Sequence, residues 1–280
     1  MALPADTSSA IKAAWVIFDR GPDHFQWFND RRVRAFASDQ GLALVFAMHC
    51  RSKEREDMIV EPEKGVARAL FTALSQFAES EGRPELNTTR IIAMGWSGAG
   101  SLVGRLAGYR PGRYLAGIAY APGSYEPLGM DTIELSAQAI VRPQLIIANG
   151  SDNVCGTERP YQYFKKYFER GAPWTFVVQN RAPHCCLQNA QTLILEWLRG
   201  VLAAELSPRD IEEYGYLTVE FSNVADEWKR PVFNAKAARI GPKGKGKRGE
   251  LPSGWMPSNG FAQEWLVFTR RPAPVAIWRP

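Results

Sequence analysis

The chain has 280 residues, enough for one large domain or for one domain with an appendage. Its 45% apolar and 22% charged residues are ordinary for a globular protein, and no apolar stretch approaches the length of a membrane span. The net charge of +5 is modest and its basic residues are scattered, except in the Gly- and Lys-rich stretch 241–249. We expect that stretch to be a solvated loop, and we expect no nucleic-acid partner.

Short apolar runs alternate with amphipathic segments along most of the chain. Strands are predicted at 14–18, 42–47, 90–94, 114–120, 144–148 and 175–178, and helices at 28–38, 63–78, 99–107, 159–170 and 190–202. Strands that are almost continuously apolar are typical of a parallel sheet covered on both sides. The sequence therefore predicts an α/β fold with a mostly parallel central sheet, helices on both faces and no large cap.

The alternation changes after residue 206. Strands are predicted at 216–221 and 232–240, and a closing helix at 260–268. We therefore predict a core at 1–206 and a C-terminal extension at 207–280, which packs on the core and could complete it.

The segment Gly95-Trp96-Ser97-Gly98-Ala99-Gly100 follows directly on a predicted apolar strand and precedes a helix. A sharp strand-to-helix turn of small residues can present a serine hydroxyl above a sheet, where it acts as a nucleophile. Ser97 is therefore the candidate nucleophile. Such a motif occurs by chance, so it needs a base and an acid elsewhere in the chain.

Both partners follow in the expected order. His184 comes after the strand at 175–178 and is the histidine placed to act as the base, whereas His24 and His49 precede Ser97. Asp152 follows the strand at 144–148 and is the candidate acid, with Glu158 as the alternative. Because ligand sites in parallel sheets lie beyond the carboxyl ends of the strands, we expect Ser97, Asp152 and His184 to converge.

An oxyanion hole requires backbone N–H groups that point at the developing negative charge. Gly98, the first residue after the serine, is one candidate donor, because it begins a helix whose dipole also helps. The second candidate is Arg20, in the loop after the first strand.

With these residues in place, the chain resembles the α/β-hydrolase family, and more loosely its dienelactone-hydrolase-like, feruloyl-esterase-like and polyester-depolymerase-like esterases. The resemblance covers about residues 14–204, with 255–268 as a candidate for the closing helix. It implies that Ser97, Asp152 and His184 form a catalytic triad.

Two features depart from the family pattern. Ala99 stands where a second glycine is usual, and it is small enough for the turn to survive. The usual leading hairpin is missing, which indicates a truncated or minimal sheet. Neither departure removes a catalytic group.

The short interval between the strands at 114–120 and 144–148 leaves no room for a folded lid, so we expect an open cleft. Its wall candidates are aromatic: Trp96, Phe25, Trp27, Tyr125 and Trp255. Apart from Trp96, which adjoins the serine, each of these is more typical of core or ordinary surface packing than of a substrate contact.

The leading hypothesis is a carboxylic-ester hydrolase that acts on a small-molecule or polymeric ester through an acyl-enzyme. A lactone or dienelactone hydrolase, a thioesterase or a peptidase would use the same triad, and a non-catalytic binding protein on a hydrolase scaffold is the alternative of another class. We expect no cofactor and no metal, because the three histidines are separated and the chain has no His-x-x-x-His or Cys-x-x-Cys spacing.

The compartment is left open by the sequence. The N-terminal residues show no targeting segment, which suits a cytoplasmic protein, or a secreted or periplasmic one whose signal peptide has been removed. The four cysteines are Cys50, Cys155, Cys185 and Cys186. They could form one disulfide, which would favour an exported protein, or remain buried thiols.

Overall fold

The computed structural model describes residues 1–6, 8–19, 22–48, 62, 65–123, 134–185, 187–206, 213–222 and 231–271. They form two compact units, Met1–Ala119 with Tyr125–Arg142, and Tyr120–Ser124 with Pro143–Pro280. The division predicted at residue 206 falls inside the second unit and stays a prediction. No helix in these ranges is long and apolar enough to cross a membrane.

The first unit alternates strands with helices. Its elements are β1 (Ala13–Phe18), α1 (Pro22–Asn29), α2 (Arg31–Asp39), β2 (Leu42–Ala47), α4 (Val66–Ser80), η2 (Pro84–Asn87), β3 (Ile91–Trp96), α5 (Gly98–Tyr109), η3 (Pro111–Arg113), β4 (Tyr114–Tyr120) and α6 (Ala137–Ile140). Strand β1 pairs in parallel with both β2 and β3, in the order β2-β1-β3-β4. Every residue of β1 is buried, as expected for a strand that is covered on both faces.

Large aromatic side chains join these strands to the helices. Trp15 of β1 receives edge-on contacts from Trp27 of α1 and from Phe36 of α2. Gly117 of β4 lies so close to α5 that a Cβ there would come 2.8 Å from Val103. Helix α5 therefore packs tightly over its strands.

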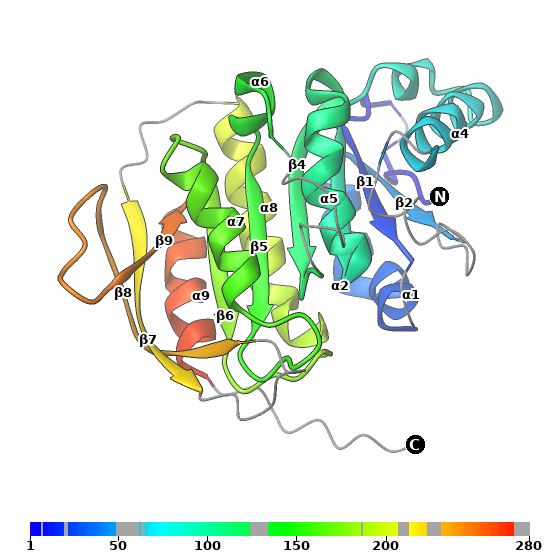
Figure 1. The fold of residues 1–280 in the computed structure, drawn as a ribbon. Helices are drawn as coiled ribbons and strands as arrows, with labels where there is room; N and C mark the ends of the chain where they lie inside the picture. The colour runs from blue at the N-terminus through cyan, green and yellow to red at the C-terminus, as the bar shows by residue number, and fades with distance from the viewer. Residues whose placement is uncertain are drawn as a thin grey trace. The chain divides into compact units, whose positions relative to one another are not determined.

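The second unit begins with a parallel pair and ends with an antiparallel one. Its elements are β5 (Gln144–Asn149), α7 (Glu158–Phe168), β6 (Trp174–Gln179), η4 (Leu187–Ala190), α8 (Gln191–Leu206), β7 (Glu213–Ser222), β8 (Val232–Pro242), β9 (Leu251–Trp255) and α9 (Asn259–Arg270). The strand order is β5-β6-β9-β7-β8; β5 and β6 are parallel, and the three later strands join by antiparallel pairing. Figure 1 shows α7 on one face of β5 and β6, and α8 and α9 on the other.

These features confirm the predicted fold class, an α/β fold with a mostly parallel sheet and helices on both faces. The strands at 42–47 and 114–120 have the predicted bounds. The helix expected at 28–38 is instead the end of α1 followed by α2. Asp30 separates them, because its carboxylate accepts hydrogen bonds from the N–H groups of Arg32 and Val33 and so caps α2.

Strand β9 was not predicted, because Pro252 and Gly254 make its sequence a poor strand former. Gly254 has a φ of 95°, and a Cβ there would come 2.0 Å from the carbonyl oxygen of Trp174. Only glycine permits this close approach to β6.

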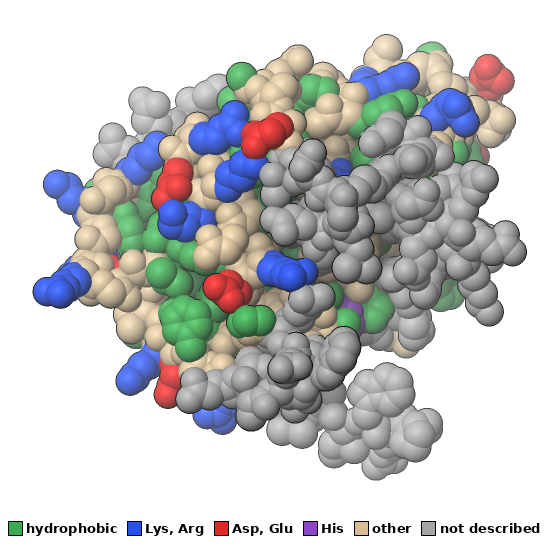
Figure 2. All heavy atoms as spheres, in the orientation of Figure 1, with side chains coloured by type: hydrophobic (Ala, Val, Ile, Leu, Met, Phe, Trp, Pro, Cys, Tyr) green, Lys and Arg blue, Asp and Glu red, His purple; other side chains and the backbone are tan. Residues whose placement is uncertain are grey.

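The basic stretch 241–249 connects β8 to β9. Its residues 242–249 are exposed, and Arg239 and Glu250 are joined by an ion pair at its base. Figure 2 shows the Lys and Arg side chains dispersed among acidic, hydrophobic and other side chains.

Candidate active site

Ser97 lies at the turn between β3 and α5, in a conformation that side chains rarely adopt. Its φ is 55° and its ψ is −124°, and it occupies the N-cap position of α5. Non-glycine residues avoid positive φ, so the surrounding structure must hold this backbone in place. The strand-to-helix turn predicted from the sequence is therefore present, with the serine at its apex.

The turn explains why its neighbours are small. A Cβ on Gly95 would lie 2.4 Å from the carbonyl oxygen of Ala99, so a larger residue cannot stand at position 95. Alanine at position 99 is compatible with the turn. Gly98 is the first residue of α5, and the N–H groups in the first turn of a helix have no acceptor within the helix. Such an N–H group can donate a hydrogen bond to a negative charge that develops near Ser97.

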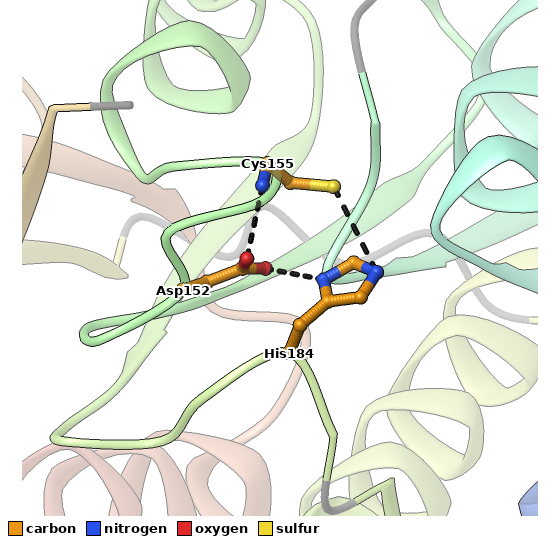
Figure 3. Close-up of side chains that lie close together, drawn as sticks. All are labelled: Asp152, Cys155 and His184. Carbon is orange, nitrogen blue, oxygen red and sulfur yellow. Dashed lines mark hydrogen bonds and ion pairs between the residues drawn. The ribbon is translucent and has the colours of Figure 1, made fainter. Parts of the chain in front are cut away.

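Asp152 and His184 meet in the second unit (Figure 3). His184 Nδ1 lies 2.6 Å from Asp152 Oδ2, while the other carboxylate oxygen accepts hydrogen bonds of 2.9 Å from the N–H groups of Val154 and Cys155. The carboxylate of Asp152 is fully buried. Because an ionised carboxylate only accepts hydrogen bonds, Nδ1 is the donor in this pair, and a neutral imidazole in that tautomer has Nε2 as its acceptor.

Two buried polar side chains hold the loop that carries His184. Asn149 Nδ2 donates to the carbonyl oxygens of Pro183, at 2.7 Å, and of Cys185, at 3.0 Å. The hydroxyl of Tyr120 donates to the same Cys185 carbonyl at 2.6 Å. These bonds restrain the backbone on either side of the histidine. Sequence reasoning missed them, since Tyr120 appears there only as the end of a strand and Asn149 only as the first residue of a loop.

Asn234 of β8 connects the loop of the acid to the loop of the base. Its Nδ2 donates to the carbonyl oxygen of Gly150 at 2.9 Å, and its Oδ1 accepts from the N–H of Arg181 at 2.7 Å. A Cβ on Gly150 would come 2.1 Å from that Oδ1, so a side chain there would displace the Asn234 amide. A strand of the predicted C-terminal extension thus supports both loops.

The other predicted residues have varied positions. Trp27 is buried against Trp15 and serves the core, whereas Phe25 is 54% exposed and packs on Phe46. Trp255 ends β9 and is half-buried. Arg20 and Tyr125 lie outside the described residues.

Trp96 is half-buried beside the serine and packs on His24, their ring centres 6.0 Å apart. His24 belongs to α1 and is fully buried. Burial lowers the pKa of His24 to about 4, because the charged imidazolium would lose its hydration. His24 is therefore neutral near pH 7 and contributes no charge beside Trp96.

Cys155 carries a buried thiol, and its Sγ lies 4.0 Å from His184 Nε2. Cys185, by contrast, is disulfide-bonded. Cys50 and Cys186 lie outside the described residues. Glu158, the alternative acid, begins α7, whereas the carboxylate bonded to His184 belongs to Asp152.

No protein-family model matches the chain, and no curated protein matches its sequence. Among solved structures, the crystal structure of LpqC, a poly(3-hydroxybutyrate) depolymerase from Bordetella parapertussis, is similar over 74% of this chain and 82% of its own, with 16% identity and a TM-score of 0.44. A likeness this distant does not identify a shared activity.

Proposed function

We propose that the protein is a serine hydrolase that cleaves carboxylic esters through an acyl-enzyme, with Ser97 as nucleophile, His184 as base and Asp152 as the residue that orients the base. The observation that carries the proposal is the φ of 55° at Ser97, a non-glycine residue between a buried strand and a helix. Strained backbone of this kind is found at functional sites, and this turn is characteristic of a nucleophile.

The hydrogen-bonded Asp152–His184 pair supports the proposal. In the proposed reaction, Nε2 takes the proton of the Ser97 hydroxyl while Oγ bonds to the ester carbonyl carbon. The N–H of Gly98, with that of Arg20, stabilises the negative oxygen that forms. Collapse breaks the bond to the alcohol, which leaves with the proton held by His184. Water, activated by the same histidine, then releases the acid and restores the serine.

The substrate is proposed as a small-molecule or polymeric ester. A lactone, dienelactone or thioester would meet the same groups, so a panel that varies the acyl and alcohol parts distinguishes these substrates. The panel should include a lactone, a thioester and a feruloyl ester. Rates that rise with aromatic size on either side of the ester would favour a role for Trp96 in binding.

The decisive experiment replaces the serine. Ser97→Ala should abolish hydrolysis of short-chain p-nitrophenyl esters, measured without added metal. Ser101→Ala, four residues further along the same helix, is the matched control and should keep wild-type activity. Ser101 is buried in α5, so the control reports on packing without touching the turn.

Covalent labelling gives an independent result. An organophosphonate should add once per chain, and peptide mass spectrometry should place the adduct on Ser97. Full activity in Ser97→Ala would overturn the nucleophile assignment. A wild-type protein that neither hydrolyses any ester of the panel nor reacts with the phosphonate would instead favour a non-catalytic binding protein.

A further inference from the structure

Three side chains of the second unit bring metal-ligating atoms together. One ligand atom each from Asp152, Cys155 and His184 lies within 4.8 Å of the other two. In Figure 3 the carboxylate faces one ring nitrogen of His184 and the thiol faces the other. The contact between Cys155 Sγ and His184 Nε2 is 4.0 Å. The spacing in the sequence gives no hint of this pair, because the two residues are 29 positions apart.

We propose that Cys155 Sγ and His184 Nε2 bind a zinc ion, with Asp152 as the outer partner that orients the imidazole. Zinc binds thiolate sulfur and imidazole nitrogen well, whereas magnesium and calcium prefer oxygen ligands. The thiol gives up its proton to solvent as the zinc–sulfur bond forms, and Nε2 contributes its lone pair.

The distances fit a tetrahedral ion. Bonds of about 2.3 Å to sulfur and about 2.1 Å to nitrogen hold these two atoms about 3.6 Å apart. The observed 4.0 Å therefore needs to close by only a few tenths of an ångström. A small rotation of the Cys155 side chain supplies that movement.

Asp152 has the role that outer carboxylates play at zinc sites. Its Oδ2 accepts from His184 Nδ1 at 2.6 Å, which directs the Nε2 lone pair outward and fixes the plane of the ring. Its other oxygen is held by two backbone N–H groups. The carboxylate therefore stays on Nδ1, and the ion takes its direct ligands from Cys155 and His184.

The two proposed ligands are not equally buried. The side chain of His184 is 17% exposed, whereas Cys155 is 8% exposed. Water would complete the coordination of the proposed ion.

Occupation of Nε2 by zinc would block the atom that takes the serine proton, so zinc would act as a reversible inhibitor. This consequence rests on the proposed function. The binding itself rests on the geometry of Cys155 and His184 alone.

Cobalt(II) is the probe for binding, because a cobalt–thiolate bond produces a charge-transfer absorption that nitrogen and oxygen ligands do not. The full-length protein, titrated with cobalt under anaerobic conditions without added reductant so that the disulfide stays intact, should show this band and lose it when zinc is added. Cys155→Ala and Cys155→Ser should lack the band. Val154→Ala, next to the cysteine but without a ligand atom, should retain it.

Zinc inhibition is then measured on p-nitrophenyl ester hydrolysis, with each variant compared with its own rate in the presence of a chelator. The zinc concentration for half-inhibition should rise more than about tenfold in Cys155→Ser, since even outer partners of zinc ligands are worth about 10- to 100-fold in affinity.

The outcomes separate the two proposals. A cobalt–thiolate band in a protein without esterase activity would support the metal site and overturn the proposed function. Ester hydrolysis without a thiolate band in the wild type would overturn the metal site and leave the function standing. Equal zinc inhibition of the wild type and Cys155→Ser would also overturn the metal site. If both cysteine variants fail to fold, the wild type still decides the matter: bound zinc should protect Cys155 from alkylation, read by peptide mass spectrometry, and equal alkylation of Cys155 with and without zinc would overturn the metal site.

Discussion

Asp152→Asn tests the orientation of the proposed base. In the wild type, one carboxylate oxygen accepts from the N–H groups of Val154 and Cys155, and the other accepts from His184 Nδ1. Asparagine has a single acceptor oxygen. The two backbone donors hold that oxygen on their side, so the amide NH₂ must face His184.

The amide reverses the hydrogen bond to the imidazole. Nδ1 must now accept, so the proton moves to Nε2, which can no longer take a proton from a serine hydroxyl. The same exchange in a well-characterised protease triad lowers kcat by about 10⁴. Because the backbone bonds leave the amide no other orientation, we expect a loss of that size, equivalent to about 5 kcal/mol of activation free energy.

The assay is kcat for a p-nitrophenyl ester at pH 7.5, with thermal unfolding as a check that the variant folds. Glu158→Gln is the matched control, since it neutralises a nearby acid at the start of α7, and it should keep wild-type kcat. An Asp152→Asn protein that folds and loses less than about tenfold in kcat would refute the argument. A severe loss in Glu158→Gln instead would identify Glu158 as the acid.

Two further predictions concern the surroundings of the site. Asn234→Ala removes the hydrogen bonds to Gly150 and Arg181. At about 1 kcal/mol per bond, the substitution should lower the free energy of unfolding by about 2 kcal/mol. It should also lower kcat. Lys236 is exposed on the same strand, and Lys236→Ala is the control. It should change neither the free energy of unfolding, measured in urea, nor kcat, measured in the esterase assay. Equal behaviour of the two variants would contradict the bridging role of Asn234. The pKa of His24 is lowered from 6.5 to about 4 in the folded protein, so the unfolded chain binds the extra proton and the free energy of unfolding falls between pH 6.5 and 4, by up to about 3 kcal/mol. Urea titrations at pH 7 and 4.5 measure the difference in the free energy of unfolding between the two pH values. His24→Phe should reduce this difference. A difference equal to that of the wild type would show that His24 is not its source.

Local patterns in the sequence were sufficient for most elements of the fold. Continuous apolar runs such as 42–47 and 114–120 predicted buried strands, because only a sheet covered on both faces buries such runs completely. The same kind of reasoning placed Ser97 in a strand-to-helix turn, since the small residues around it are a local requirement of that turn. The pairing of Asp152 with His184 also followed from chain order.

Contacts between distant residues decided the rest. The sequence by itself determined the strands, the serine turn and the candidate acid and base. Only the tertiary structure showed that Asn149 and Asn234 support the loops of the base and the acid, and that Cys155 lies against His184. Periodicity and turn propensity arise from interactions a few residues apart, whereas these contacts form only when β5, β6 and β8 come together. Gly254 illustrates the difference: as a local signal it opposes a strand, yet the close approach to β6 requires it.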